Sequence, residues 1–252
     1  MNVIEYLNRP KAASLSQRIS IKSIVDFHQL KRLDEKLLRD HIRSIYLIGV
    51  LNESTIHVRP FIDESMKYEE IHVLYVILKK DNKFSQLNQK LHVLFPNPTL
   101  IIFLSNDHHT YSTAIKHLYP SKKNQAVIDE VFMSEPSLLE DEVSQKFLKK
   151  TDLTSIKVSN LKEFYDYLIN TVYQQRLISI IHDYPESILN TDLIKKALKN
   201  IENLNTQLNQ LKADEKSLKT MRSKMENNMK QKQTQSNIDS VVQTIKEAIK
   251  HG

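Results

Sequence analysis

The first 155 residues alternate between helix-like and strand-like spacing of their apolar positions. Over residues 21–42 apolar residues recur at helical intervals, which predicts two short helices. Residues 45–51 form a short apolar run that ends at a polar stretch, 52–55, before a second apolar run at 56–58. Two apolar runs separated by a turn-like polar stretch predict a β-hairpin.

The next stretch carries the clearest strand signal in the chain. Residues 71–78 are apolar and rich in β-branched side chains, residues 82–94 place leucines on one helical face, and residues 99–104 are apolar again. Strand, helix and strand in this order predict a βαβ unit with parallel strands. Weaker strand patterns follow at residues 111–118 and 125–132. We therefore predict an α+β fold class, with an N-terminal α/β domain over residues 1–155 that contains a mixed β-sheet and helices.

From residue 159 onward the pattern is helical. A broad apolar stripe predicts that residues 156–189 form a helical connector that packs on the domain, and Pro185 ends this stripe. Residues 190–252 follow a heptad frame, which predicts a long C-terminal coiled-coil helix or a helical hairpin. The frame continues to Met225 and Met229. The residues that we expect to contact a partner along this seam are Ile194, Ile201, Leu204, Leu208, Leu211 and Leu218.

Two arrangements of this tail satisfy the pattern. Residues 231–237 include no apolar side chain, which predicts a break near Gln233, and Ser236 with Asp239 has the spacing of a cap for a last helix. If the last helix folds back, its apolar stripe covers the first one. A continuous helix that runs into a partner fits the pattern nearly as well.

The glycine and cysteine contents exclude many enzyme classes. The only glycines are Gly49 and Gly252, and phosphate-cradling loops need glycines so that the backbone can approach the anion. A Walker A loop and a GxGxxG turn are therefore excluded. Without cysteine there is no disulfide, thiolate metal site or cysteine nucleophile. Because GxSxG and HExxH motifs are also missing, we expect no cofactor and favour a non-enzymatic protein over an enzyme.

The positive charge of the chain is concentrated in the tail. Residues 190–252 hold 12 Lys/Arg and 7 Asp/Glu, whereas residues 1–189 hold 24 and 23. Such a segment attracts nucleic acid or acidic protein surfaces. A charge run on a helix is most often a solvated face, but it also suits sequence-independent binding to phosphates. The residues that we expect to bind nucleic acid are Lys216, Lys219, Arg222, Lys224, Lys230 and Lys232.

The alternative function is a divergent metal-dependent nuclease with a degenerate restriction-enzyme-like core. Such enzymes hold Mg²⁺ and a water with an acid on one strand and an acid-x-lysine on the next. Asp63 and Glu70, which precede the best strand, are the candidate catalytic acids. However, His72 stands where the lysine should be, and solvated charges beside a strand explain the same residues. His108, His109 and His117 could suggest a metal site, but adjacent histidines on a strand point to opposite faces and rarely bind one ion. The polar setting of residues 105–110 predicts a turn, and we expect no metal site there.

The order of several motifs resembles a widespread bacterial family, the domain of unknown function 4391. The resemblance covers nearly the whole chain, although the family usually has glutamine at the position of His72. The matching segments are the strand at residues 70–79, Leu94-Phe95-Pro96-Asn97-Pro98, the strand at residues 100–104, Val131-Phe132-Met133-Ser134-Glu135, the helix at residues 161–172 and the lysine- and leucine-rich tail.

What the resemblance implies is a role beside other proteins. The resemblance implies a gene setting beside helicases, DNA methyltransferases and type III restriction-like nucleases in phage-defence clusters. The family has no catalytic residues that could be assigned to this chain. We therefore expect an accessory or adaptor protein of a restriction-modification-like system. It would bind one of these proteins, or itself, through the coiled coil, and DNA non-specifically. With no signal-peptide-like start and no membrane-spanning run, the expected location is the cytoplasm.

Overall fold

The computed structural model describes residues 5, 7–64, 66–118, 126–182, 184–185, 191–215 and 220–251. The chain divides into two compact units, residues 1–176 and residues 177–252. This division falls inside the stretch 156–189, for which the sequence predicts a connector. Among the described residues, no helix is both long and apolar enough to cross a membrane.

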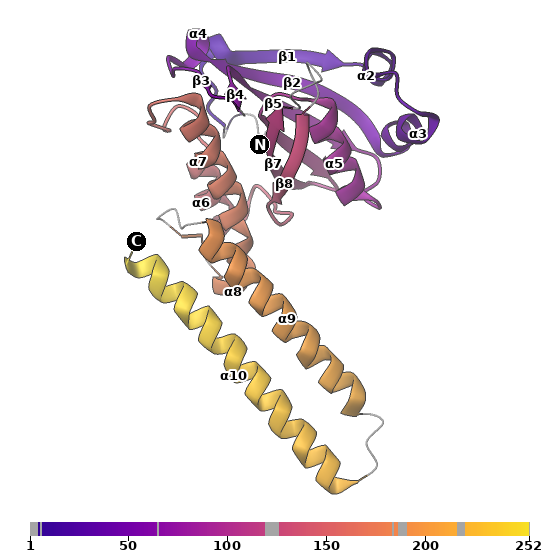
Figure 1. Ribbon diagram of the computed structural model, residues 1–252, viewed down its shortest axis with the longest axis vertical. Coiled ribbons are helices and arrows are strands. Elements are labelled where there is room, and N and C mark those ends of the chain that lie inside the picture. Colours follow the sequence, from indigo (N-terminus) through magenta and orange to yellow (C-terminus); the bar gives the residue numbers. More distant parts are fainter. Residues whose placement is uncertain are drawn as a thin grey trace. The chain divides into compact units, whose positions relative to one another are not determined.

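The first unit contains a six-stranded mixed sheet in the order β1-β2-β5-β6-β7-β8 (Figure 1). Only β5 and β6 are parallel neighbours, and the other pairs are antiparallel. The strands are β1 (Ser14–Ile19), β2 (Ile42–Asn52), β5 (Glu70–Leu78), β6 (Thr99–Ser105), β7 (His108–Leu118) and β8 (Ala126–Met133). A separate two-stranded sheet pairs β3 (Phe61–Ile62) with β4 (Lys67–Tyr68). The predicted βαβ unit is confirmed, because the helix α5 (Phe84–Leu94) connects β5 to β6.

Helices cover both faces of this sheet. In the described part of this unit the helices are α2 (Ile21–His28), α3 (Arg32–His41), α4 (Glu53–Ile56), α5, α6 (Glu142–Lys150) and α7 (Leu161–Gln174), with a 3₁₀ turn η1 (Lys11–Ala13). On one face α3 and α5 pack on alternate residues of β5 and β6, namely Leu74, Val76, Ile101 and Phe103. On the other face α7 contacts β5, β7 and β8. Burial on both faces explains why β5 and β6 are continuous apolar runs rather than alternating ones.

A single hydroxyl joins α7 to the middle of the sheet. The pairing of β6 with β7 runs from Ser105↔His108 to Ile101↔Ser112, and the same register places Thr99 opposite Ala114. There the Tyr165 hydroxyl accepts from the N–H groups of Thr99 and Ala114, at 3.1 and 3.0 Å. It lies 2.9 and 3.2 Å from their carbonyl oxygens, so its own proton is donated to one of them. A hydroxyl has one donor and two acceptor sites, and all are used here.

The predicted hairpin at residues 45–58 is wrong. The side chain of Asn52 accepts from the Thr55 N–H at 3.1 Å, and the Thr55 hydroxyl accepts from the Asn52 N–H at 2.8 Å. This reciprocal capping box starts the short helix α4 where the sequence suggested a turn. The neighbours of β2 are instead β5 and the edge strand β1, whose largely exposed side chains gave no strand signal.

The second unit contains two long helices, α9 (Thr191–Glu215) and α10 (Met221–His251), after the η2 turn (Gln175–Leu177) and the short helix α8 (Ile178–Ile181). Of the two arrangements that the sequence left open, the structure shows the helical hairpin: α9 and α10 contact each other along antiparallel axes (Figure 1). The Asn227 side chain donates to the carbonyl of Leu211 at 2.9 Å, and Gln231 donates to Glu215 at 3.2 Å. These bonds join the C-terminal end of α9 to α10.

The predicted break near Gln233 is wrong, because α10 is continuous from Met221 to His251. Glutamine and lysine are good helix formers, so a stretch without apolar residues can remain helical. Gln233 donates to Asn237 at 3.1 Å and Gln235 to Asp239 at 3.0 Å, which supports the helix at i,i+4 spacing. Within the same stretch Thr234 is buried.

The contacts of Tyr165 predict that loss of its hydroxyl alone lowers the stability of the protein. Tyr165→Phe removes one oxygen and leaves the N–H groups of Thr99 and Ala114 buried without their acceptor. We expect the free energy of unfolding to fall by about 1–3 kcal/mol, measured by urea denaturation. Tyr46→Phe, at a half-buried tyrosine of β2, is the matched control and should change it by less than about 0.5 kcal/mol. Equal effects of the two substitutions would show that the hydroxyl is not important for the sheet.

Candidate functional site

The two ends of the parallel strands differ in chemistry. At the carboxyl ends of β5 and β6 lies a cavity of about 600 Å³. At their amino ends lies a compact group of hydrogen-bonded polar side chains around Glu70 and Asn97. In open α/β sheets ligands bind outside the carboxyl ends of the strands. The cavity is therefore the first candidate for a binding site in this unit.

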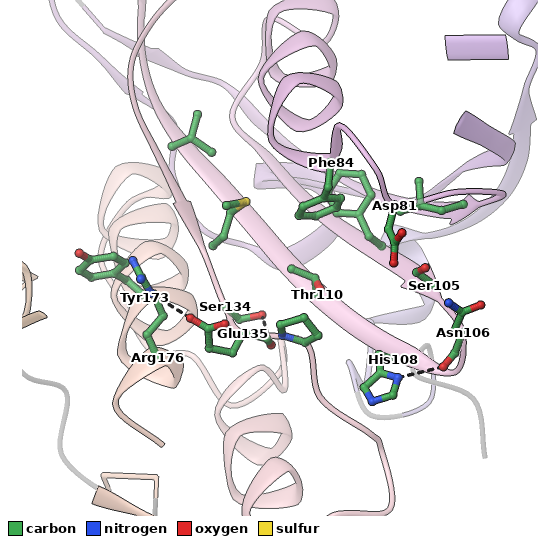
Figure 2. Close-up of a pocket in the computed structure, with 15 residues that line it drawn as sticks. Asp81, Phe84, Ser105, Asn106, His108, Thr110, Ser134, Glu135, Tyr173 and Arg176 are labelled. Carbon is green, nitrogen blue, oxygen red and sulfur yellow. Dashed lines mark hydrogen bonds and ion pairs between the residues drawn. The ribbon is translucent and has the colours of Figure 1, made fainter. Parts of the chain in front are cut away.

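Four elements form the walls of the cavity. They are the end of β5 with the start of α5, the turn between β6 and β7, the end of β8, and the end of α7 with the turn that follows it. The lining residues are Leu78, Asp81, Phe84, Phe103, Ser105, Asn106, His108, Thr110, Val131, Met133, Ser134, Glu135, Pro136, Tyr173 and Arg176 (Figure 2). All of them belong to residues 1–176.

The turn between β6 and β7 is tight, and it brings polar groups to the cavity. Asn106 and Asp107 both have positive φ, 46° and 65°, as the two central residues of a type I′ hairpin turn require. Asparagine and aspartate tolerate this conformation better than other non-glycine residues. The Asn106 carbonyl lies 2.9 Å from His108 Nδ1. A polar turn is thus present, but it is confined to Asn106 and Asp107, and His108 and His109 belong to β7.

An ion pair occupies the opposite end of the cavity. In Figure 2 Asp81, Ser105 and Asn106 lie toward one end, and Glu135, Tyr173 and Arg176 toward the other. Arg176 Nε donates to Glu135 Oε1 at 3.3 Å, and the guanidinium lies 5.7 Å from the centre of the Tyr173 ring. Of the cavity residues the sequence raised only His108, as a metal ligand that it then set aside. For Asp81, Ser105 and Asn106 the signal that could have found them is their position just after predicted strands.

The candidate nuclease acids occupy structural positions. Glu70 Oε1 lies 2.7 Å from His72 Nε2 and accepts from Asn97 Nδ2 at 2.6 Å. Asp63 accepts from the Met66 N–H at 2.6 Å and thereby closes the turn between β3 and β4. Among the residues that the structure describes, no group of three His, Asp or Glu side chains is placed to hold a metal ion. The geometry around Glu70 therefore gives the nuclease alternative no support.

The histidines that the sequence grouped are separated. His109 is buried, and burial lowers its pKa to about 4. His108 is exposed at the turn, and His117 Nδ1 lies 2.8 Å from a carboxylate oxygen of Asp129. Neighbouring side chains of β7 thus point to opposite faces, as expected for a strand.

Lys116 is the most unusual titratable residue of the first unit. Its side chain is buried, and Nζ donates to the carbonyls of Phe95 and Asn97 at 2.6 and 2.8 Å. Burial lowers the pKa of Lys116 to about 7. Both acceptors lie in the loop that contains Pro96 and Pro98, and a proline has no N–H of its own with which to anchor a loop. We interpret Lys116 as the residue that fixes this loop to β7.

The predicted seam is partly buried in the second unit. Ile194, Ile201 and Leu208 are buried, and Leu204 and Leu211 are half-buried. Leu218 lies outside the described residues. The opposing helix contributes buried Asn227, Thr234, Ile238 and Ile245. Packing of α9 on α10 thus uses the predicted positions of α9, while a coiled coil that reaches a partner stays a prediction.

The continuation of the heptad frame into α10 is wrong. Met221, Met225 and Met229 are 77%, 62% and 70% exposed. The chain reverses direction between α9 and α10, so α10 buries a different stripe of its surface. Because these methionines are four residues apart, they lie on one side of the helix, and the hairpin leaves this methionine stripe uncovered.

The predicted nucleic-acid-binding residues surround α10 instead of forming one face. Arg222, Lys224, Lys230 and Lys232 are exposed, and residues two apart in a helix point in different directions. Arg222 also contacts Glu226 at 3.0 Å, an exposed ion pair that adds little stability. Lys216 and Lys219 lie outside the described residues.

Fold and site together define an α+β protein with a mixed six-stranded sheet, a cavity at the carboxyl edge of its parallel strands and a separate helical hairpin. The family model described as a domain of unknown function (DUF4391) matches residues 7–238. The chain belongs to this family, as the order of its motifs suggested. No curated protein and no solved structure matches it.

The lowered pKa of Lys116 predicts a pH dependence of stability. Because the folded pKa is about 7 and the unfolded one near 10.5, the unfolded chain binds more protons between these values. The free energy of unfolding should therefore rise with pH over this window, by up to about 1.4 kcal/mol per pH unit, from this residue. Lys116→Met should remove that rise, as measured by urea unfolding at several pH values. Parallel pH profiles of the two proteins would contradict the assignment.

Proposed function

We propose that this protein is a non-enzymatic accessory or adaptor protein that binds a protein partner through its helical hairpin. The observation that carries the proposal is the uncovered methionine stripe, Met221, Met225 and Met229, on α10. A pair of helices buries one stripe of each, so a second apolar stripe has no cover within the hairpin. Methionine side chains adapt to irregular surfaces and are common at binding surfaces.

A second feature of the hairpin supports the same role. Near its open end a groove of about 620 Å³ lies between α9 and α10. Its apolar lining includes Leu193, Ala197, Val241 and Ile245, and the oppositely charged Asp192 and Lys196 lie among them. Leu193 is 42% exposed. An amphipathic helix lays its apolar face into such grooves. Because Arg222, Lys224 and Lys230 lie beside the methionine stripe, the expected partner segment is an amphipathic helix with acidic flanks.

The biological setting of the proposal is bacterial anti-phage defence of the restriction-modification kind. It is supported by the gene neighbourhood that the family resemblance implies, and the expected partner is a helicase, DNA methyltransferase or nuclease of that system. Exposed Arg222, Lys224, Lys230 and Lys232 support weak, sequence-independent attraction to DNA near that partner. Self-association through the hairpin is the competing outcome.

The methionine stripe gives the first test. In the full chain, Met225→Glu together with Met229→Glu places two charges on the proposed surface and should weaken the complex with a co-expressed partner at least tenfold. The loss follows from burying an unpaired charge at an apolar contact. Size-exclusion chromatography with light scattering measures complex and self-association, and circular dichroism checks helicity.

A matched control places the same charge on the other helix of the hairpin. Asn205→Glu together with Asn209→Glu changes two exposed residues of α9 that are also four apart, and it should leave the complex intact. If the methionine variant and this control bind the partner equally, the stripe is not the docking surface. If the methionine variant abolishes only a homodimer, self-association replaces the adaptor role.

The DNA proposal predicts a salt-dependent affinity. Replacing Arg222, Lys224, Lys230 and Lys232 with glutamine should weaken binding to duplexes of random sequence. The slope of log affinity against log salt should fall by about 0.9 for each phosphate that the variant no longer neutralises. Fluorescence anisotropy at several salt concentrations measures both. The control removes four exposed lysines of the first unit, Lys22, Lys36, Lys149 and Lys157. Equally weakened binding by the two variants would indicate a general charge effect and no site on the hairpin.

A further inference from the structure

We propose that the cavity at the carboxyl ends of β5 and β6 binds a planar aromatic or heterocyclic compound that carries no negative charge and offers N–H or O–H donors. The inference concerns the first unit alone. It is independent of the hairpin and of the accessory function proposed above.

The size and the walls of the cavity suit a planar small molecule. Its volume of about 600 Å³ lies in the range of small-molecule sites, about 300–1,000 Å³. The rings of Phe84 and Phe103 meet edge to face, with centroids 4.8 Å apart and planes at 79°. Together with Val131 and Met133 they give an apolar wall against which a flat ring can pack.

The polar groups at one end of the cavity have no protein partner. Among the described residues, the side chains of Asp81, Ser105, Asn106 and Thr110 make no hydrogen bond or ion pair. Thr110 lines the cavity although only 8% of its surface is exposed. Three segments, the β5–α5 loop, the β6–β7 turn and β7, bring these groups together at one edge. Their convergence is what a ligand with several polar atoms requires.

Charge decides which ligands fit. The Asp81 carboxylate is an acceptor only and carries a negative charge. Arg176 is the cation that could balance it, but Arg176 is paired with Glu135 and packed on Tyr173. A phosphate or carboxylate would therefore meet the Asp81 charge in a cavity whose one described lining Lys or Arg side chain, Arg176, is already paired. A donor-bearing neutral or positively charged ring finds an acceptor in Asp81 and an apolar wall beside it.

The test uses three probes with the full chain: adenosine, which is neutral, tyramine, which is a cation, and adenosine 5′-monophosphate, which is an anion. Binding is followed by calorimetry and by amide chemical shifts near the cavity. We expect adenosine and tyramine to bind saturably, and the monophosphate to bind at least tenfold more weakly than adenosine. Tighter or equal binding of the monophosphate would overturn the proposed charge preference.

Two substitutions place the site. Asp81→Asn, at an exposed position, removes one charge without loss of packing. It should weaken the binding of tyramine about tenfold, which is the effect expected from losing a charged hydrogen bond. Phe84→Ala removes part of the apolar wall and should weaken the binding of both adenosine and tyramine. Asp26→Asn, an exposed aspartate on α2, is the matched control and should change nothing. Absence of binding by adenosine and tyramine up to their solubility, or binding unchanged by Asp81→Asn, would overturn the proposal.

Discussion

The Tyr165 hydroxyl bridges β6 and β7 of the first unit at the point where these two strands stop pairing with each other. Beyond Ile101↔Ser112 the backbones of β6 and β7 are bridged by this oxygen, which bonds to Thr99 and Ala114. A hydroxyl can do so because its two lone pairs accept from the two N–H groups and its one proton is donated to one of the two carbonyls. The interaction also ties α7 to the sheet, and thereby places Tyr173 and Arg176, at the other end of that helical segment, beside the cavity.

The two ends of the parallel strands illustrate how a structural polar cluster differs from a candidate binding site. At the amino ends Glu70, His72 and Asn97 bond to one another, and Lys116 fixes the adjoining loop. Such a cluster is satisfied by the protein itself and needs no ligand. At the carboxyl ends the polar side chains face a cavity and lack such partners among the described residues. Polar side chains therefore form a structural cluster at one edge and a candidate binding site at the other. Their hydrogen bonds distinguish the two cases.

The helical hairpin combines apolar contacts with polar contacts that fix how its two helices align. Toward its open end α10 buries Ile238 and Ile245, whereas toward the turn it buries Asn227 and Thr234. Asn227 gains a specific bond to the Leu211 carbonyl, which fixes the alignment of the two helices. Polar contacts of this kind specify register at some cost in stability. The same alignment turns the methionine stripe outward, so the surface proposed for partner binding results from how the hairpin is specified.

The sequence alone determined the elements whose apolar pattern is strong: α2, α3, β5, α5 and β6, the parallel βαβ unit, the buried positions of α9, and membership of the family. It could not determine the fate of weakly patterned segments, because β1 and α4 depend on pairing and capping with residues that propensity does not weigh. The outward position of Met225 depends on a chain reversal that the heptad frame does not encode. The cavity, too, was decided only by tertiary structure, because Asp81, Asn106 and Thr110 become neighbours only when the strand order brings their loops to one edge of the sheet.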